Sequence, residues 1–442
     1  MSVVPNIIFL LLLVTGIVFF IRNVKKLKRN IDLGQHLDRS DRKRERWSQM
    51  AKIALGQSKM TSRPIAGALH IVVYAGFVII NIEILEIVID GLFGTHRIFA
   101  FAGGWYDFLI GSFELLAFLV LVSVIIFWIR RMILKIPRFW NKEMTSWPKN
   151  DALNILYFEM VLMSLFLLMN GADYALQRMG AIHYVQAGSF PISQFIADIL
   201  PQNELVLYYI ERGAWWLHII GILIFLNYLY YSKHLHILLA FPNTFYGNLE
   251  PQGALDNLEA VTQEVKLMMD PDADPYAEVA EDEGAIAKFG ASDVTDLNWV
   301  QLMNAYTCTE CGRCTSVCPA NQTGKELSPR AIMMKTRDRL EEVGKFIDKK
   351  DEAVFRSEGD GKSLFSYISD EEIWACTTCN AFVTECPVSI DPLSIIIDLR
   401  RYLVMEKSSA PQELNSMMAN IENNGAPWPY NQMDRLNWKD EQ

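Results

Sequence analysis

The chain has 442 residues, is 51% hydrophobic and carries a formal net charge of −10. That length allows two or three domains, and the two other values together indicate a membrane part joined to an acidic, water-exposed part. The charge argues against a nucleic-acid partner, because phosphate binding needs a basic patch. All seven cysteines lie within residues 308–386, which excludes a secreted disulfide framework with cysteines spread along the chain.

Five apolar stretches are predicted to cross a membrane. Residues 3–21, 64–82 and 213–232 contain no Asp, Glu, Lys or Arg, and each is about long enough to cross ~30 Å of hydrocarbon as a helix. Residues 105–129 and 152–172 are weaker candidates, because they contain Glu114 and Glu159. A cleaved signal peptide is a poor alternative for the first stretch, since its basic residues follow the apolar run.

The basic residues of the connecting loops predict the orientation. The loops 22–63 and 130–150 hold nineteen Lys and Arg residues, whereas 91–107 and 173–212 hold three. Because cytoplasmic loops are enriched in Lys and Arg, the N-terminus is expected outside a bacterial cytoplasmic membrane and the region after the fifth span inside it.

The domain organisation follows from this pattern. We expect a five-span membrane domain at 1–243, an acidic linker at 244–294 and a mostly α-helical, dicluster ferredoxin-like domain at 295–442. Residues 270–283 contain seven acids and no base, which is typical of a solvated segment, although docking of a basic partner is an alternative. The chain contains no Walker or Rossmann sequence for a nucleotide.

The cysteines predict two iron–sulfur clusters. The first motif, CTECGRCTSVCP, follows the C-x2-C-x2-C-x3-C-P pattern, and CTTCNAFVTECP repeats it. Three thiolates at this spacing bind one cluster, while the cysteine before proline binds the other. The expected ligands are Cys308, Cys311, Cys314 and Cys386 for cluster one, and Cys318, Cys376 and Cys379 for cluster two. Zinc is the alternative for any C-x2-C pair, but the paired four-position motifs disfavour it.

Phe382 occupies the position of the eighth cysteine. Three thiolates suit a [3Fe–4S] cluster, which is the interpretation we favour. A [4Fe–4S] cluster with an oxygen ligand is the second possibility, with Thr378, Thr384 and Glu385 as candidates. In the third, cluster two is absent and Phe382 is part of the core.

Three histidines are candidate haem b ligands. His218 and His236 are eighteen residues apart, so they share one face of a continuous helix, about 27 Å apart. His70 lies at the depth of His236 and is its expected axial partner. The outer partner of His218 is open, with Asn81 and His96 as the residues weighed. We expect the remaining histidines to be ordinary interfacial residues: His36, His96, His183 and His234.

Four acids lie within or near the spans: Glu83, Glu86, Glu114 and Glu159. Acids in membrane spans can carry protons to a quinone, or they can be interfacial. The sequence singles out none of the four.

With these residues identified, two family resemblances can be stated. Residues 1–243 resemble the dihaem cytochrome b subunit of respiratory nitrate reductase, but Ile80 stands where that family has a second histidine. Residues 295–442 resemble the small subunit of heterodisulfide reductases, through CTECGRC, SPR at 328–330 and IWACTTCNA. That family has cysteine at position 382.

The resemblance implies an oxidoreductase subunit that passes electrons from a cytoplasmic donor through clusters and haem b to menaquinone. It also implies a partner chain with CCG domains that carries the substrate-side catalytic centre, and electron-transfer flavoprotein as a possible donor. Reverse flow from quinol to a heterodisulfide reductase-like partner is an alternative, as is a membrane redox sensor or anchor.

Overall fold

The computed structural model describes residues 3–271 and 288–440, so most of the acidic segment at 270–283 lies outside the described residues. Within the described ranges the secondary structure is helical, and the one β-type contact is an isolated bridge between Gln35 and Asn298. The predicted all-α fold class is therefore confirmed.

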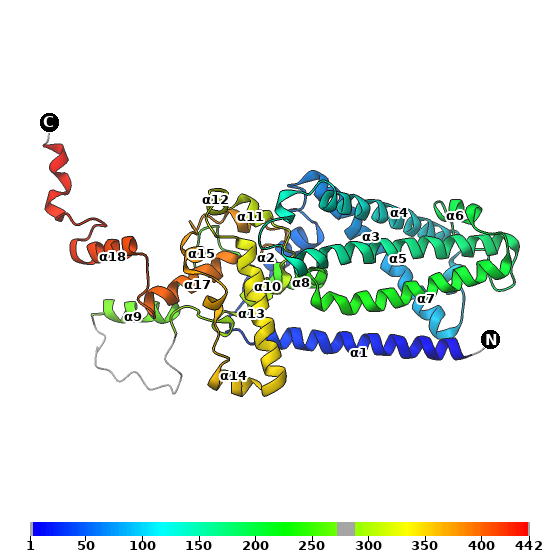
Figure 1. The fold of residues 1–442 in the computed structure, drawn as a ribbon, viewed down its shortest axis with the longest axis horizontal. Helices are drawn as coiled ribbons and strands as arrows, with labels where there is room; N and C mark the ends of the chain where they lie inside the picture. Colours follow the sequence, from blue (N-terminus) through cyan, green and yellow to red (C-terminus); the bar gives the residue numbers. More distant parts are fainter. Residues whose placement is uncertain (1–2, 272–287, 441–442) are drawn as a thin grey trace.

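Five long helices form a bundle that occupies one half of the molecule (Figure 1). By length and composition each could cross a membrane, and they coincide with the five predicted stretches, except that α7 ends at Tyr228, before the predicted end at residue 232. At most other ends they extend past those stretches because the flanking polar residues are also good helix formers. Their bounds are α1 Val4–Asp32, α3 Pro64–Phe93, α4 Gly104–Met132, α5 Ser146–Met179 and α7 Glu204–Tyr228.

The helix ends follow ordinary capping chemistry. Pro64 occupies the first turn of α3, and Asn203 caps α7 by accepting a hydrogen bond from the Val206 backbone N–H. Gly94 and Gly180 end α3 and α5 with φ of 70° and 72°, a backbone conformation that glycine adopts at little cost.

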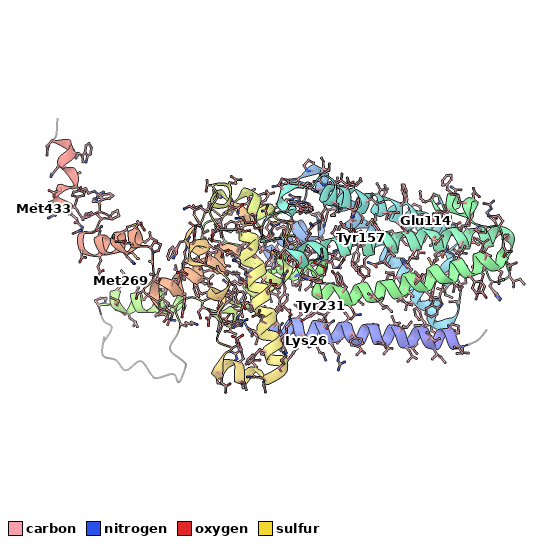
Figure 2. All side chains as sticks on the ribbon, in the orientation of Figure 1. Lys26, Glu114, Tyr157, Tyr231, Met269 and Met433 are labelled. Atoms are coloured by element: carbon pink, nitrogen blue, oxygen red, sulfur yellow. The ribbon has the colours of Figure 1, made fainter. Side chains whose placement is uncertain are left out.

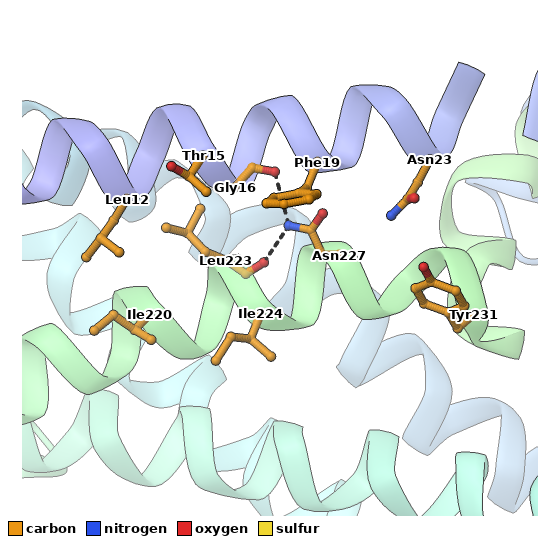
Figure 3. Close-up of a pocket in the computed structure, with 10 residues that line it drawn as sticks. All are labelled: Leu12, Thr15, Gly16, Phe19, Asn23, Ile220, Leu223, Ile224, Asn227 and Tyr231. Carbon is orange, nitrogen blue, oxygen red and sulfur yellow. Dashed lines mark hydrogen bonds between the residues drawn. The ribbon is translucent and has the colours of Figure 1, made fainter. Parts of the chain in front are cut away.

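Helix α1 lies at the edge of the bundle, along α7 (Figures 1 and 3). The Asn227 amide donates hydrogen bonds to the carbonyls of Gly16 (3.1 Å) and Leu223 (3.0 Å). A Cβ atom at Gly16 would lie 3.1 Å from Leu223 Cδ2, so the small residue allows this close approach. Small residues and interhelical amides are how helices associate in lipid.

The fifth span does not continue as one helix to His236. Helix α7 ends at Tyr228, two short 3-10 turns follow, and Ser232 between them is extended, with φ −114° and ψ 149°. The Ser232 hydroxyl accepts a hydrogen bond from the His234 backbone N–H, and Asp151 accepts one from the Lys233 N–H at 3.0 Å. The prediction that His218 and His236 share one face of a single helix is therefore wrong.

The second half of the molecule is built from short helices around the long α13 (Pro329–Lys350). Its core also buries Leu27, Leu33, Leu235 and Ala240, which come from the ends of the bundle helices and the segment after α7. The packing is therefore continuous between the two halves. The other helices of this half are α8 His236–Phe245, α10 Trp299–Thr307, α11 Arg313–Val317, α12 Pro319–Gln322, α14 Glu352–Glu358, α15 Asp370–Trp374, α16 Ala381–Glu385 and α17 Pro392–Met405.

The end of the bundle next to the cysteine-containing half is called the near end, and the opposite end is called the far end. The N-terminus lies at the end far from the cysteine-containing half (Figure 1), whereas Lys26 and Tyr231 lie next to that half (Figure 2). The connecting helix α2 (Lys43–Met50) lies at the near end, against α8, and α6 (Ser193–Ile199) lies at the far end. Helices α9 (Glu259–Met269) and α18 (Gln412–Asn424) project away; Figure 2 labels Met269 at the end of α9 and Met433 in the 3-10 helix Gln432–Lys439 that follows α18.

Candidate functional site

Four cysteines from the two motifs line a single pocket in the second half of the molecule. They are the residues expected to bind cluster one: Cys308, Cys311, Cys314 and Cys386. Their thiols are also close enough to act on one another electrostatically. Burial raises the pKa of Cys308 to about 12 and that of Cys386 to about 11, so binding a metal here must displace protons from these thiols.

The other three cysteines form a second group. Cys376 interacts electrostatically with Cys318 and Cys379, and Cys318 likewise with Cys379. Cys318 and Cys376 are buried, whereas Cys379 is exposed. The structure thus brings together the two groups that the spacing predicts, with one cysteine of each motif crossing to the other group. Ligation of iron by these groups stays a prediction, since no three His, Cys, Asp or Glu side chains among the described residues are arranged tightly around a single metal position.

The two cysteine loops share one backbone conformation. In the first loop Glu310 and Gly312 have positive φ (51° and 71°), and in the second Thr378 and Asn380, at the equivalent positions, have φ of 57° and 58°. A short helix follows each loop, and these helices, α11 and α16, pack against each other. Left-handed backbone costs a non-glycine residue roughly 1–2 kcal/mol. The second loop, with Cys376 and Cys379, thus has the same conformation as the first, although Phe382 replaces a cysteine in the helix that follows it.

Phe382 points inward from α16. Its side chain is 1% exposed and lines the pocket of the cluster-one cysteines. Two of the oxygen ligands considered for cluster two have other partners, since Glu385 pairs with Arg63 at 2.7 Å and Thr384 accepts a hydrogen bond from Gln252 at 2.6 Å. Thr378 remains beside the group, with its N–H 3.4 Å from the Cys376 sulfur.

On the three-iron interpretation favoured from the sequence, replacing Phe382 by cysteine is expected to convert cluster two from [3Fe–4S] to [4Fe–4S], because position 382 is that of the missing thiolate in the motif. Electron paramagnetic resonance of the air-oxidised protein should then lose the near-isotropic signal of an oxidised [3Fe–4S] cluster. Phe355→Cys is the matched control, since this buried ring lies in α14, outside the cysteine pocket; both changes cost about 3 kcal/mol of packing. A wild-type protein without that signal would rule out the three-iron assignment.

His70 and His236 meet at the near end of the bundle. Their ring centroids are 6.4 Å apart, with 37° between the ring planes. Two imidazoles that bind one metal from opposite sides, each at a metal–nitrogen distance of about 2.0 Å, place their ring centroids about 6.3 Å apart. The predicted pairing of these histidines is therefore present in the structure, despite the break in the fifth span.

The free nitrogens of this pair fit a haem. His236 Nδ1 lies 3.0 Å from the Lys233 carbonyl oxygen, which leaves Nε2 for a metal. Such a contact on the second nitrogen is usual for ligating histidines, because it fixes the ring orientation. His70 Nδ1 is buried without a hydrogen-bond partner among the described residues. Buried polar atoms are normally paired, so this one favours a bound group.

His218 lies deeper in the bundle, against α5. Its Nδ1 is 3.0 Å from the Leu162 carbonyl and its ring is 5.9 Å from that of Phe166. The residues considered as its axial partner have other contacts, since Asn81 donates to the Phe77 carbonyl of its own helix and His96 lies 3.4 Å from Asp173. His218 therefore has no histidine beside it comparable to the His70–His236 pair among the described residues, and its role as a haem ligand stays a prediction.

Two histidines expected to be interfacial are paired with acids. His96 contacts Asp173, and His234 lies 3.6 Å from Glu159 and packs against His236. Both side chains are largely buried, at 19% and 13% exposure, so they have specific partners within the protein; their interfacial position at the ends of spans stays a prediction. The acids Asp173 and Glu159 hold them in the bundle, a tertiary contact that the sequence does not reveal.

The first cysteine group faces the bundle. Lys59 and Arg138, from the loops at the near end, are close enough to act electrostatically on Cys386 and Cys311, respectively. Arg313, between Cys311 and Cys314, acts in the same way on His70. The first cysteine group is therefore the one that these contacts bring near the histidine pair, and Cys379 of the second group is exposed.

Three of the four acids in the spans have structural partners. Glu86 accepts hydrogen bonds from Tyr106 (2.8 Å) and the Phe99 N–H (2.9 Å), and Glu114 accepts two at 3.1 Å from the first turn of α6. Glu159 pairs with His234. Glu83 differs, because its Oε2 is buried and neither of its oxygens has a hydrogen bond or ion pair among the described residues, whereas Glu114 has an unpaired oxygen only beside a bonded one.

Glu83 lines a cavity of about 1010 Å³ at the far end of the bundle. Arg97 crosses this region and donates hydrogen bonds to Asp173 (2.6 Å), Asn170 (3.0 Å) and Tyr106 (3.1 Å). Trp215 and Trp216 form part of the apolar wall. A mixed apolar and polar cavity of this size is typical of a small-molecule site.

Comparison with known proteins identifies the cysteine region. Residues 307–390 match the family model described as "4Fe-4S dicluster domain". The cysteine region is therefore similar to dicluster iron–sulfur domains, and the described part of the chain also carries five helices long and apolar enough to cross a membrane.

Two relatives match 98% of this chain. One is "Probable iron-sulfur-binding oxidoreductase FadF" of Bacillus subtilis, at 30% identity, and the other is "EtfAB:quinone oxidoreductase" of Syntrophomonas wolfei, at 24%. The chain spans 60% and 59% of their lengths. One component of a dihydromethanophenazine-dependent heterodisulfide reductase of Methanosarcina mazei is 27% identical over 33% of this chain and 35% of its own length. No solved structure matches significantly.

Proposed function

We propose that this protein is the membrane electron-transfer part of a quinone-linked oxidoreductase. When bound, two iron–sulfur clusters and one haem b would supply one-electron relays between a donor and menaquinone. Cys308, Cys311, Cys314 and Cys386 hold cluster one, the other three cysteines hold cluster two, and His70 and His236 hold the haem. A second haem at His218, as in the nitrate reductase-like dihaem arrangement, is the alternative haem count, and its axial partner is open.

The observation that carries the proposal is the position of the cysteine groups relative to the protein surface and the histidine pair. Cys379 is exposed, so a soluble donor can approach the second cysteine group directly. The first group lies near the bundle, where Arg313 links it to His70. Centres that transfer electrons must be close to one another, and this arrangement supports transfer between a protein surface and the membrane.

The proposed sidedness rests on the loops. The basic loops 22–63 and 130–150 lie at the end of the bundle that meets the cysteine-containing half; for example, Arg63 pairs with Glu385 and Arg330 with Glu143. By the positive-inside rule this end is cytoplasmic. We therefore place the iron–sulfur region in the cytoplasm and the cavity of Glu83 toward the outer surface, with Glu83 as a candidate proton carrier between that surface and the quinone.

The similarity to "EtfAB:quinone oxidoreductase" supports electron-transfer flavoprotein as the donor. The heterodisulfide reductase similarity supports the alternative direction, from quinol to a cytoplasmic partner. In either direction we place the catalytic centre for the soluble substrate on a partner chain with CCG domains, as the family resemblance implies.

Direction can be tested with the purified protein in lipid nanodiscs. Reduced electron-transfer flavoprotein should reduce a menaquinone analogue at a rate that depends on this protein. Quinol-driven reduction of a heterodisulfide by the complex, without activity toward the flavoprotein, would select the reverse direction. No electron exchange with quinone in either assay would leave the sensor or anchor as the function.

Glu83→Gln is expected to slow quinone reduction about 100-fold while haem reduction from the iron–sulfur side is unchanged, because a positioned proton-transfer group typically contributes 10²–10⁴ in rate. Glu204→Gln, at the exposed first turn of α7, is the matched control. Stopped-flow recording of haem and quinone separates the two steps. Equal quinone rates in both variants would exclude Glu83 from proton exchange.

A further inference from the structure

We infer that Glu310 is a positioning residue that holds the first cysteine loop against the segment carrying His236. Its buried ion pair with Lys233 joins the iron–sulfur region to the membrane bundle. This inference rests on the proposed function, because it concerns transfer between cluster one and the histidine pair. Glu310 lies between two predicted ligands, Cys308 and Cys311, but is not itself a predicted ligand.

The geometry of Glu310 is specific. Its side chain is 2% exposed, and its carboxylate forms ion pairs on both sides, with Lys233 and with Arg337 (2.7 Å). Arg337 belongs to α13 of the iron–sulfur half, whereas Lys233 belongs to the turn after α7. The carboxylate therefore joins the two halves of the molecule.

Lys233 is fixed from the bundle side. Its ammonium group, on a side chain only 8% exposed, donates a hydrogen bond to the Pro148 carbonyl at 2.6 Å, and its backbone N–H donates to Asp151 at 3.0 Å. Asp151 also accepts a hydrogen bond from Tyr228, at the end of α7, at 2.6 Å. The Lys233 carbonyl oxygen in turn contacts His236 Nδ1 at 3.0 Å. One residue thus contacts both the cysteine loop and the predicted haem ligand.

The same loop has a second anchor. Arg330 is fully buried, contacts the Glu310 carbonyl at 3.4 Å and pairs with Glu143, which lies in the loop before α5. Glu310 itself has φ of 51°, a left-handed conformation that carries a backbone cost for a residue with a side chain. A strained residue with two buried cations is a specific arrangement, since removing one partner of a buried pair leaves an uncompensated charge.

The test compares Glu310→Gln and Lys233→Met with the double variant, in the full-length protein. Glutamine keeps the shape and some hydrogen bonds but removes the charge. The exposed pair Arg356–Glu352 provides the control Glu352→Gln. We expect Glu310→Gln to retain both clusters and haem, and to slow electron transfer from the iron–sulfur region to haem by ~10- to 100-fold, since a misplacement of about 1 Å can cost 100-fold.

Distance-sensitive readouts separate positioning from folding. In Glu310→Gln, the enhancement of cluster-one spin relaxation by oxidised haem should weaken, and amide hydrogen exchange at residues 308–318 should rise. The double variant should recover part of the single-variant loss, because Lys233 is no longer left as an unpaired buried cation, while Arg337 keeps Asp338 as a partner. Unchanged transfer rate and unchanged exchange in Glu310→Gln would overturn the inference, as would loss of cofactors that fully accounts for the slower rate.

The hydrogen-exchange measurement also distinguishes the two proposals. A wild-type protein without haem would refute the haem step of the proposed function. Increased exchange at residues 308–318 in Glu310→Gln would still support the junction in that case, and unchanged exchange would refute it.

Discussion

Replacing His70 or His236 by alanine is expected to abolish haem b in purified protein, because the two rings are the pair that the structure places at ligating distance. Each remaining imidazole would bind a haem iron from one side only. Reduced-minus-oxidised absorption spectra and pyridine haemochrome assays measure the loss. His36→Ala is the matched control, since His36 is exposed in the loop after α1, and it should retain full haem content.

The same pair of variants should leave both iron–sulfur signals intact, because the cysteines lie in a separate pocket. Haem lost from His218→Ala and retained in His70→Ala would contradict the assignment. It would place the haem deeper in the bundle, beside Leu162 and Phe166.

Replacing Cys386 by alanine is expected to eliminate cluster one, although Cys386 belongs to the second motif. Electron transfer from the donor to haem b should then stop. The reason for the loss of cluster one is the crossed arrangement, in which Cys386 lines the pocket of Cys308, Cys311 and Cys314. Cys379→Ala, the matched variant in the same motif, should instead affect cluster two. Iron content and low-temperature electron paramagnetic resonance of the reduced proteins measure both effects.

If Cys386→Ala abolished the cluster-two signal and left cluster one intact, each motif would bind its own cluster. The crossed pairing would then be wrong. Electron transfer from donor to haem should be lost in both variants, since the proposal places the cysteine groups in series.

The helical fold and the grouping of cysteines could be predicted from the sequence because both depend on local patterns. Apolar runs of about twenty residues determine spanning helices, and the C-x2-C-x2-C-x3-C-P spacing determines which thiols converge. The meeting of His70 and His236 was predicted from depth alone, and the structure brings these rings together.

The contacts between distant segments could not be predicted. The break at Ser232 depends on Lys233, whose ammonium pairs with Glu310 from another half of the molecule. Helical periodicity carries no information about such a partner, so the shared-face argument for His218 and His236 was wrong. The four membrane acids looked equivalent in sequence, and only their partners separate Glu83 from the other three.

The most direct test of the central claim is the order in which the centres respond when electrons enter from the iron–sulfur side. The protein in nanodiscs with a menaquinone analogue would be mixed with a soluble reductant that does not enter lipid, and haem absorption would be followed while freeze-quenched samples report the clusters. The proposal predicts reduction of the clusters first, then haem b, then quinone, with the last two steps lost in His70→Ala. Reduction of quinone at the wild-type rate in His70→Ala, or reduced clusters beside a haem that stays oxidised, would contradict it.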